Sequence, residues 1–155
     1  MITFEYYTPS FLPEANEAVA RFVSGMIWGR SENAFGQHSS MGVFDGNELI
    51  AGTVYHNWYP STQVMELSSA SVSKRWLMPK VIYAMFAFPF DMMGAQMVAL
   101  RVSEKNKTMV SIAKRFGFEG VLIPRLRGRD ESEWIFTLTD DAWRDNPIAK
   151  RYRDV

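Results

Sequence analysis

Glu66 and His56 are the residues of this 155-residue chain best suited to acid–base chemistry. Glu66 stands in VMELSSASV, a run of otherwise apolar and small residues, where partial burial would remove water from the carboxylate and favour its use as a base. His56 lies in VYHNWY, in a neighbouring β-rich run, and could pass a proton through a water molecule. Each also has a plainer interpretation, because Glu66 could be salt-bridged or exposed at an edge, and a lone histidine is often structural.

The other residue types exclude several chemistries. The chain has no cysteine, which rules out disulfides, thiolate metal sites and a cysteine nucleophile. Its second histidine, His38, lies in the polar segment GRSENAFGQHSS, where it could cover a substrate pocket. Two isolated histidines give no metal-ligand spacing, so no metal is expected. No G-x-S-x-G elbow or other spacing singles out a nucleophilic serine.

Charge and hydropathy limit the classes of partner that the chain is expected to bind. Seventeen basic and seventeen acidic residues cancel, so no overall field attracts nucleic acid or an anionic membrane. The most apolar segment, LMPKVIYAMFAFPF, contains Lys80 and is shorter than the ~20 residues that a membrane span needs. The N-terminus MITFEYYTPSF lacks the basic region of a signal peptide. We expect a cytoplasmic protein of one domain, residues 1–155, with neither membrane nor nucleic acid as its partner.

The first half of the chain reads as strand, helix and three further strands. ITFEYY alternates as a short strand, and PEANEAVARFVSGMIW has helical spacing that places Val19, Phe22, Val23 and Met26 on one face. GRSENAFGQHSS is predicted to be a loop or a short helix. Asp45-Gly46-Asn47 joins two β-rich runs as a hairpin, because glycine and asparagine tolerate positive φ. QVMELSSASVS is then a third antiparallel strand.

The second half alternates helices and strands. PKVIYAMFAFPF is apolar nearly all round, as expected of a helix packed against a sheet, and QMVALRV alternates as a strand. A helix follows Asn106, with Gly117 placed for a left-handed C-terminal turn and Phe118 for the hydrophobic contact behind it. FEGVLIPRL and WIFTL are strands separated by a charged loop, RGRDESE, and DDAWRDNPIAKRYRDV is a short capped helix with a polar tail. A mixed sheet with helices on its faces is the natural architecture.

This order, together with an asparagine followed by a helix that ends in RFGFEG, resembles the GNAT acetyltransferase superfamily. The matching residues of its late motif are Asn106, Phe116, Gly117, Phe118, Glu119 and Gly120. The next stretch resembles the branch that acetylates ribosomal-protein N-termini and small amines, through Arg125, Asp130 and Trp143. SKRWLMPKVIYAMFAFPF is also similar to phage-borne members, which suggests a phage origin.

The resemblance implies an α/β (α+β) fold with a GNAT-like mixed, mostly antiparallel central sheet and helices on both faces. It implies an acetyl-CoA-dependent N-acetyltransferase that transfers acetyl to a primary amine by direct attack in a ternary complex. The acceptor would be a small molecule, a protein N-terminus or a lysine, and the protein a monomer or homodimer. The alternatives are a catalytically silent GNAT-like domain that binds a protein or nucleic-acid partner, and an acetyltransferase that acts on nucleic-acid bases.

The resemblance also implies where acetyl-CoA binds. In this fold the pantetheine arm lies where the strand Met65 to Ser73 separates from the strand Gln96 to Val102, and a backbone NH near Val72 would polarise the thioester. The pyrophosphate would lie at the start of the next helix. The implied cofactor residues are Ala70, Val72, Ser73, Lys74, Arg75, Trp76, Leu77, Met78, Lys80 and Asn106. The implied substrate residues are Trp28, His38, Arg125 and Arg127, and the catalytic ones Glu66 and His56.

Two departures from the family pattern concern the cofactor and the chemistry. Leu77 and Pro79 stand where glycines usually wrap the phosphate, so that Lys74, Arg75 and Lys80 would have to compensate by charge. Many members protonate the leaving thiolate with a tyrosine in the helix after Asn106. The corresponding residue here is Ala113, so the acid must come from elsewhere.

Overall fold

Within residues 1–153, which the computed structural model describes, seven strands form one sheet in the order β1-β2-β3-β4-β5-β7-β6. The pair β4 and β5 is parallel and the other neighbouring pairs are antiparallel. The mixed, mostly antiparallel sheet is therefore confirmed. The strands are β1 (Ile2–Tyr7), β2 (His38–Asp45), β3 (Glu48–Tyr59), β4 (Val64–Ser71), β5 (Met97–Ser103), β6 (Glu119–Gly128) and β7 (Glu131–Thr139).

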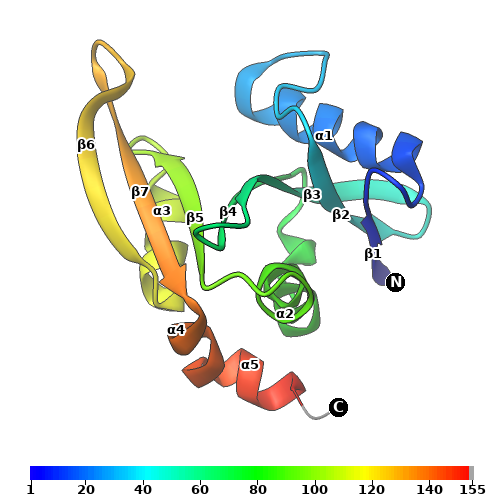
Figure 1. The fold of residues 1–155 in the computed structure, drawn as a ribbon. Coiled ribbons are helices and arrows are strands. Elements are labelled where there is room, and N and C mark those ends of the chain that lie inside the picture. The colour runs from blue at the N-terminus through cyan, green and yellow to red at the C-terminus, as the bar shows by residue number, and fades with distance from the viewer. Residues whose placement is uncertain (154–155) are drawn as a thin grey trace.

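Helices cover both faces of this sheet (Figure 1). On one face lies α1 (Pro13–Trp28), and on the other lie α2 (Pro79–Ala87) and α3 (Lys107–Phe116). A 3-10 turn, η1 (Lys74–Trp76), precedes α2, and a π-helical turn, η2 (Phe88–Met92), follows it. The predicted last helix is instead two helices, α4 (Asp140–Asp145) and α5 (Pro147–Tyr152), because Asn146 leaves the helical conformation and caps α5. None of the described helices is long and apolar enough to cross a membrane.

The packing of α1 against β3 depends on Gly52. A Cβ atom at this position would lie 2.7 Å from Val19 Cγ1 and 3.1 Å from Val23 Cγ2, so only glycine permits the close approach of the helix. The prediction that Met26 belongs to the buried face is wrong, since its side chain is 46% exposed. The buried residue near this end of α1 is Ser24, whose Oγ accepts a hydrogen bond from the NH of Ala34 at 3.1 Å.

The end of α3 has the predicted capping geometry. Gly117 has a φ of 112°, and its NH donates to the carbonyl of Lys114, while the NH of Phe118 donates to that of Ala113. These two bonds form a Schellman motif. Phe118 is buried and its ring lies 5.9 Å from that of Phe116, so the hydrophobic contact is also confirmed.

The strands β6 and β7 are longer than predicted. The charged stretch from Arg127 to Glu133 was expected to be a loop, but β6 continues to Gly128 and β7 starts at Glu131, so only a tight turn joins them. A register shift between Ile123 and Gly128 accommodates Arg125, which has a positive φ of 64°. The extra length brings charged side chains of both strands into the sheet.

Two alanine substitutions test the contact between α1 and β3. Gly52→Ala should reduce the free energy of unfolding by about 1–3 kcal/mol, because the new methyl group overpacks a closed interface. Gly25→Ala, at an exposed position of α1 where a Cβ would meet its nearest atom at 3.5 Å, should raise it by about 0.5–1 kcal/mol through helix propensity. Urea unfolding followed by circular dichroism measures both. Equal effects of the two variants would contradict this account of Gly52.

Candidate functional site

The sheet opens between its two parallel strands (Figure 1). The β4–β5 pairing runs from Val64 and Met97 to Leu67 and Leu100, although β4 continues to Ser71 and β5 to Ser103. Beyond Leu67, β4 stays paired with β3 and β5 stays paired with β7. The two strands therefore separate inside the sheet rather than at its edge, as the resemblance implied.

The separation leaves backbone groups of β4 facing β5 without a ladder partner. The NH of Val72 donates to the carbonyl of Ile50 at 2.9 Å, which shows that it points toward β3. The NH of Val72 itself therefore does not face the opening, and the expectation that an NH near Val72 polarises the thioester stays a prediction for its neighbours. Because backbone direction alternates along a strand, the NH groups of Ser69 and Ser71 point the opposite way, toward the opening.

A row of titratable side chains crosses the sheet beside this opening. His38 of β2 pairs with His56 of β3, and His56 pairs with Glu66 of β4. Directly opposed residues of antiparallel strands share a face, so the three side chains lie on the face that α1 covers. Sequence alone placed these residues in separate segments, and the register brings them together.

His56 is the most enclosed member of this row. Its side chain is 7% exposed, its ring centroid lies 4.7 Å from that of Phe35, and its Nε2 lies 2.9 Å from Ser68 Oγ. Burial lowers the pKa of His56, Glu66 opposes this shift, and the neighbouring His38 and Arg101 add to it. The imidazole is thus held neutral at neutral pH while a carboxylate on the next strand can stabilise its protonated form.

Glu66 is half-buried at the end of the row nearest β5. Its Oε2 accepts a hydrogen bond from Asn57 Nδ2 at 2.8 Å, and Asn57 adopts a positive φ of 51°. Glu66 makes no ion pair with any residue of the described 1–153 segment, which disfavours the salt-bridged alternative. The carboxylate keeps accepting capacity beside the strand separation.

His38 and Trp28 lie on the α1 side of the site. The ring of His38 is buried between two carbonyl oxygens, that of Gly36 at 2.7 Å from Nδ1 and that of Asn16 at 3.0 Å from Nε2. These contacts fix the 29–37 loop to α1. Trp28 is 48% exposed at the end of α1, and its ring lies 5.3 Å from that of Phe35. His38 is therefore held against α1, whereas Trp28 is open to solvent at the end of that helix.

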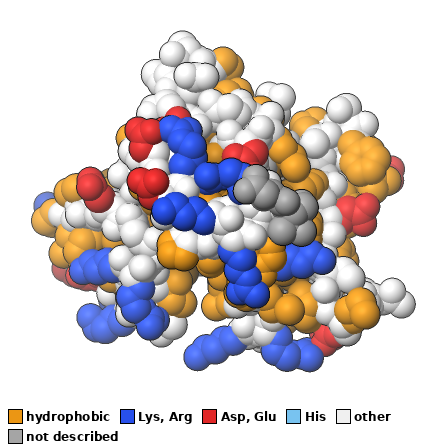
Figure 2. Space-filling view, turned by 90° about the horizontal axis from the view of Figure 1, so that it is seen from below, with side chains coloured by type: hydrophobic (Ala, Val, Ile, Leu, Met, Phe, Trp, Pro, Cys, Tyr) orange, Lys and Arg blue, Asp and Glu red, His pale blue; other side chains and the backbone are white. Residues whose placement is uncertain are grey.

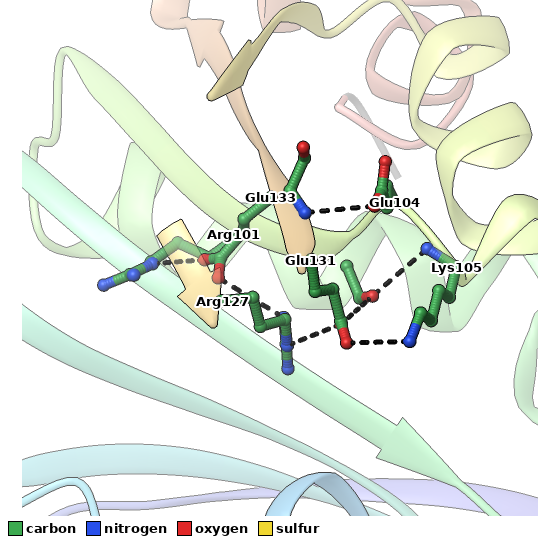
Figure 3. A network of polar contacts seen from close by, with 8 residues as sticks. Arg101, Glu104, Lys105, Arg127, Glu131 and Glu133 are labelled. Carbon is green, nitrogen blue, oxygen red and sulfur yellow. Dashed lines mark hydrogen bonds and ion pairs between the residues drawn. The ribbon is translucent and has the colours of Figure 1, made fainter. Parts of the chain in front are cut away.

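An ion-pair network joins β5, β6 and β7 (Figure 3). Glu133 is only 3% exposed, and its carboxylate lies 2.5 Å from Arg101 Nε and 3.6 Å from Arg127 Nη1. Glu131 contacts Arg127 and Lys105, and the hydroxyl of Ser103 donates to it, which together with these cations lowers the pKa of Glu131. Arg127 is thus held in the network, whereas Arg125 is exposed in the bulge of β6.

The segment before α2 offers fewer free groups than expected for phosphate. Ser73 caps η1 by accepting the NH of Arg75, and the guanidinium of Arg75 lies 2.5 Å from Asp45. Trp76 is 8% exposed and its ring packs in the core. The exposed members of the predicted set are Val72, Lys74, Arg75, Leu77, Met78, Lys80 and Asn106. Half-buried Ala70 packs toward α1.

The first turn of α2 still provides backbone donors. Its first intrahelical bond runs from the NH of Ile82 to the carbonyl of Met78, and no side chain caps this end. The preceding NH groups of Lys80 and Val81 are therefore free of helix partners, while Pro79 has none to offer. A depression of about 280 Å³ adjoins them, lined by Met1, Ile2, Thr3, Phe4, Met78, Lys80 and Val81. Lys and Arg side chains occur at several places on the face seen in Figure 2.

Asn106 has a structural role that its cofactor assignment did not include. Its Oδ1 accepts the NH of Met109 at 3.2 Å, so it is the N-cap of α3. The cap uses the oxygen and leaves the amide NH2 group for another acceptor. No group of three or more His, Asp or Glu side chains that could hold a metal ion occurs in residues 1–153.

Comparison with known proteins gives matches by structure. No family model and no curated protein matches the chain. A spermidine N-acetyltransferase from Vibrio cholerae, solved as a dodecamer, matches with a TM-score of 0.70 over 93% of this chain and 96% of that one, at 11% identity. A GCN5-related N-acetyltransferase from Brucella melitensis matches with a TM-score of 0.68 over 99% and 81%, at 14% identity.

The chain has the GNAT acetyltransferase fold. A ribosomal-protein-serine acetyltransferase structure from Vibrio cholerae also matches, with a TM-score of 0.54 over 64% of this chain and 63% of that one, at 17% identity. The chain spans 63% of the length of another matching acetyltransferase. The resemblance drawn from the motif after Asn106 is thus confirmed for the fold, and the phage association stays a prediction.

Two residues beside the strand separation were not singled out by sequence reasoning. Ser68 is one of several serines in VMELSSASV, and Arg101 is the charged residue of the strand QMVALRV. The period-2 pattern could have placed Ser68 on the face of Glu66, two residues away. Its contact with His56 depends on the β3–β4 register, which no local pattern gives.

Replacing His56 should change how stability depends on pH. Below about pH 6.5, the usual pKa of histidine, the unfolded chain binds a proton that buried His56 does not, so the free energy of unfolding falls as the pH falls. His56→Gln does not titrate, and should lose less stability than the wild type between pH 7 and pH 5. Urea unfolding at both values measures the difference, with Ser40→Ala as a control that keeps the wild-type dependence. Identical dependence in His56→Gln and the wild type would contradict a buried neutral histidine.

Proposed function

We propose that the chain is an acetyl-CoA-dependent N-acetyltransferase that transfers an acetyl group to a primary amine by direct attack in a ternary complex. The observation that supports this best is the separation of β4 from β5 beside Glu66 and His56. Unpaired backbone groups inside a sheet can bind an extended, amide-rich arm such as pantetheine. The arm would then end next to a carboxylate that accepts protons.

The cofactor would lie along the separated strands and past the start of α2. The NH groups of Lys80 and Val81, at the positive end of the α2 dipole, favour the pyrophosphate, and the ammonium groups of Lys80 and Lys74 add charge. The amide of Asn106 faces the same cofactor from the start of α3. The NH of Ser69 would polarise the thioester carbonyl, in the role first expected near Val72.

The acceptor would approach on the α1 face. An alkylamine is protonated at neutral pH and must lose a proton before it attacks. Glu66 both attracts the ammonium group and can accept that proton, which passes on to solvent. Exposed Trp28 at the end of α1 and exposed Arg125 in β6 would contact the rest of the acceptor. The structural neighbours include enzymes named for spermidine and for a ribosomal protein, so small amines and protein N-termini are the acceptors to examine first.

Acetyl-CoA should stabilise the folded chain. At about 100 times its Kd, a ligand that binds only the folded state adds about 2.7 kcal/mol to the free energy of unfolding. Thermal unfolding with and without millimolar acetyl-CoA measures the shift. Lys80→Ala should weaken the shift, and Lys150→Ala on α5 should leave it unchanged. No shift at millimolar acetyl-CoA would favour a silent binding domain instead.

Glu66→Gln should slow acetyl transfer without preventing cofactor binding. Loss of a general base costs about 10²- to 10⁴-fold in rate, and the amide still accepts the hydrogen bond from Asn57. The chain is incubated with acetyl-CoA and with spermidine, a peptide with a free N-terminus or an N-blocked lysine peptide, and intact-mass spectrometry identifies which acceptor gains an acetyl group. The initial rates of acetylation of that acceptor by the variant and the wild type are then compared at pH 7. Glu48→Gln, at an exposed residue of β3, is the matched control. Equal rates for Glu66→Gln and the wild type would remove Glu66 from the mechanism.

A further inference from the structure

The proposed reaction needs a proton donor for the thiolate, and α3 does not supply it. Ala113, which stands where many family members carry the tyrosine, is 1% exposed and packed in the core. Tyr6 and Tyr55 lie within the sheet, but their hydroxyls donate to the carbonyls of Ala84 and Met85 in α2. Burial further raises the pKa of both phenols. On the α1 face, the place next to the strand separation lies just beyond the last residue of β4 that pairs with β5.

Ser68 occupies that place. It is the first residue of β4 beyond Leu67, the last one paired with β5. Residues two apart on a strand share a face and lie about 7 Å apart, so the hydroxyl of Ser68 and the carboxylate of Glu66 border the same opening on the α1 face. The Oγ of Ser68 lies 2.9 Å from Nε2 of His56.

We propose, on the basis of the proposed acetyltransferase function, that Ser68 is the general acid for the leaving thiolate and that His56 holds the proton for it. After the amine nitrogen attacks and the C–N bond forms, the nitrogen still carries a surplus proton. Ser68 Oγ takes this proton as its own hydroxyl proton moves to His56 Nε2. As the C–S bond breaks, His56 returns a proton to Ser68, whose hydroxyl proton moves to the sulfur. One proton passes from nitrogen to sulfur, and both side chains regain their starting state.

The surroundings of His56 suit this task. The ring faces Glu66 on β4, His38 on β2, Arg101 on β5 and Phe35 in the 29–37 loop. Burial keeps the imidazole neutral and able to accept a proton, and the carboxylate of Glu66 stabilises the imidazolium that forms. Phe35 shields this side of the ring from water.

A second serine on the same face makes a different kind of contact. Ser40 pairs with Val54, which pairs with Ser68, so the two serines share a row and a face. Ser40 is fully buried and donates to Asn16 Oδ1 at 2.7 Å, which is an amide that does not titrate. Ser68 is bonded to a titratable ring and lies at the opening, whereas Ser40 lies two strands away from it.

The test compares donors whose leaving groups differ in their need for a proton. With acetyl-CoA, whose alkyl thiol has a pKa of about 8.5 or higher, Ser68→Ala should lower kcat by about 10²-fold or more at unchanged KM. With S-(4-nitrophenyl) thioacetate, whose thiolate leaves without a proton, the variant and the wild type should have nearly equal rates. Ser68→Thr retains a hydroxyl and should recover most of the loss. Ser40→Ala should lower thermal stability and leave kcat unchanged.

The pH dependence of kcat with acetyl-CoA provides a second readout. The wild-type rate should fall as His56 becomes protonated below about pH 6.5, and this decline should be absent in His56→Gln, whose rate is lower throughout. An unchanged kcat in Ser68→Ala, an equal loss with both donors, or a wild-type decline retained in His56→Gln would each overturn the relay. Any of these results, with amine acetylation by the wild type intact, leaves the proposed function standing. Failure of the wild type to bind acetyl-CoA overturns both.

Discussion

The early end of the parallel pairing between β4 and β5 is the constraint on which the site depends. A parallel pair requires a crossover, and here α2 and η2 supply it between Ser71 and Met97. Each strand then follows a different antiparallel partner, β3 on one side and β7 on the other. The twist of the two halves separates the strands after Leu67, and the backbone groups beyond it have no partner in the ladder. The sheet can stay open here only if the β1–β4 half and the β5–β7 half are each held in place by contacts other than the β4–β5 pairing.

Each half of the sheet is held by its own polar contacts. On one side, Asn16 of α1 donates to the carbonyl of His38 and accepts from Ser40, which fixes α1 and the 29–37 loop to β2. On the other, Arg101 and Arg127 neutralise buried Glu133 and tie β5, β7 and β6 together. Removing either arginine would leave the buried carboxylate of Glu133 without one of its partners, which is costly, so these ion pairs stabilise this half of the sheet. Stacked rings of Phe86, Phe116 and Trp143 close the opposite face between α2, α3 and α4, which leaves the polar face for chemistry.

The sequence predicted correctly those features that depend on residues close together in the chain. The element order, the Gly46 turn and the Schellman end of α3 depend on residues close in sequence, and all three are present. The exposure of Met26 and the contact between Ser68 and His56 depend on the register and on packing between distant segments, and were misjudged or missed. For the candidate site, sequence supplied Glu66 and His56 as separate candidates. Only the pairing of β2, β3 and β4 makes them one row.

The proposed acid, Ser68, and the proposed base, Glu66, lie on the same strand, β4, and this placement suits the proposed reaction. The attacking nitrogen and the leaving sulfur are bonded to the same carbon in the tetrahedral intermediate, so the groups that serve them must lie close together on one side of the cofactor. Glu66 and Ser68 meet this condition through strand geometry alone, because alternate residues share a face. A donor on α3 would act from the other face, where Ala113 is sealed in the core. On the proposed mechanism, a serine bonded to a histidine would supply the proton that a tyrosine supplies in many GNAT enzymes, in a chain where the corresponding residue, Ala113, is packed in the core.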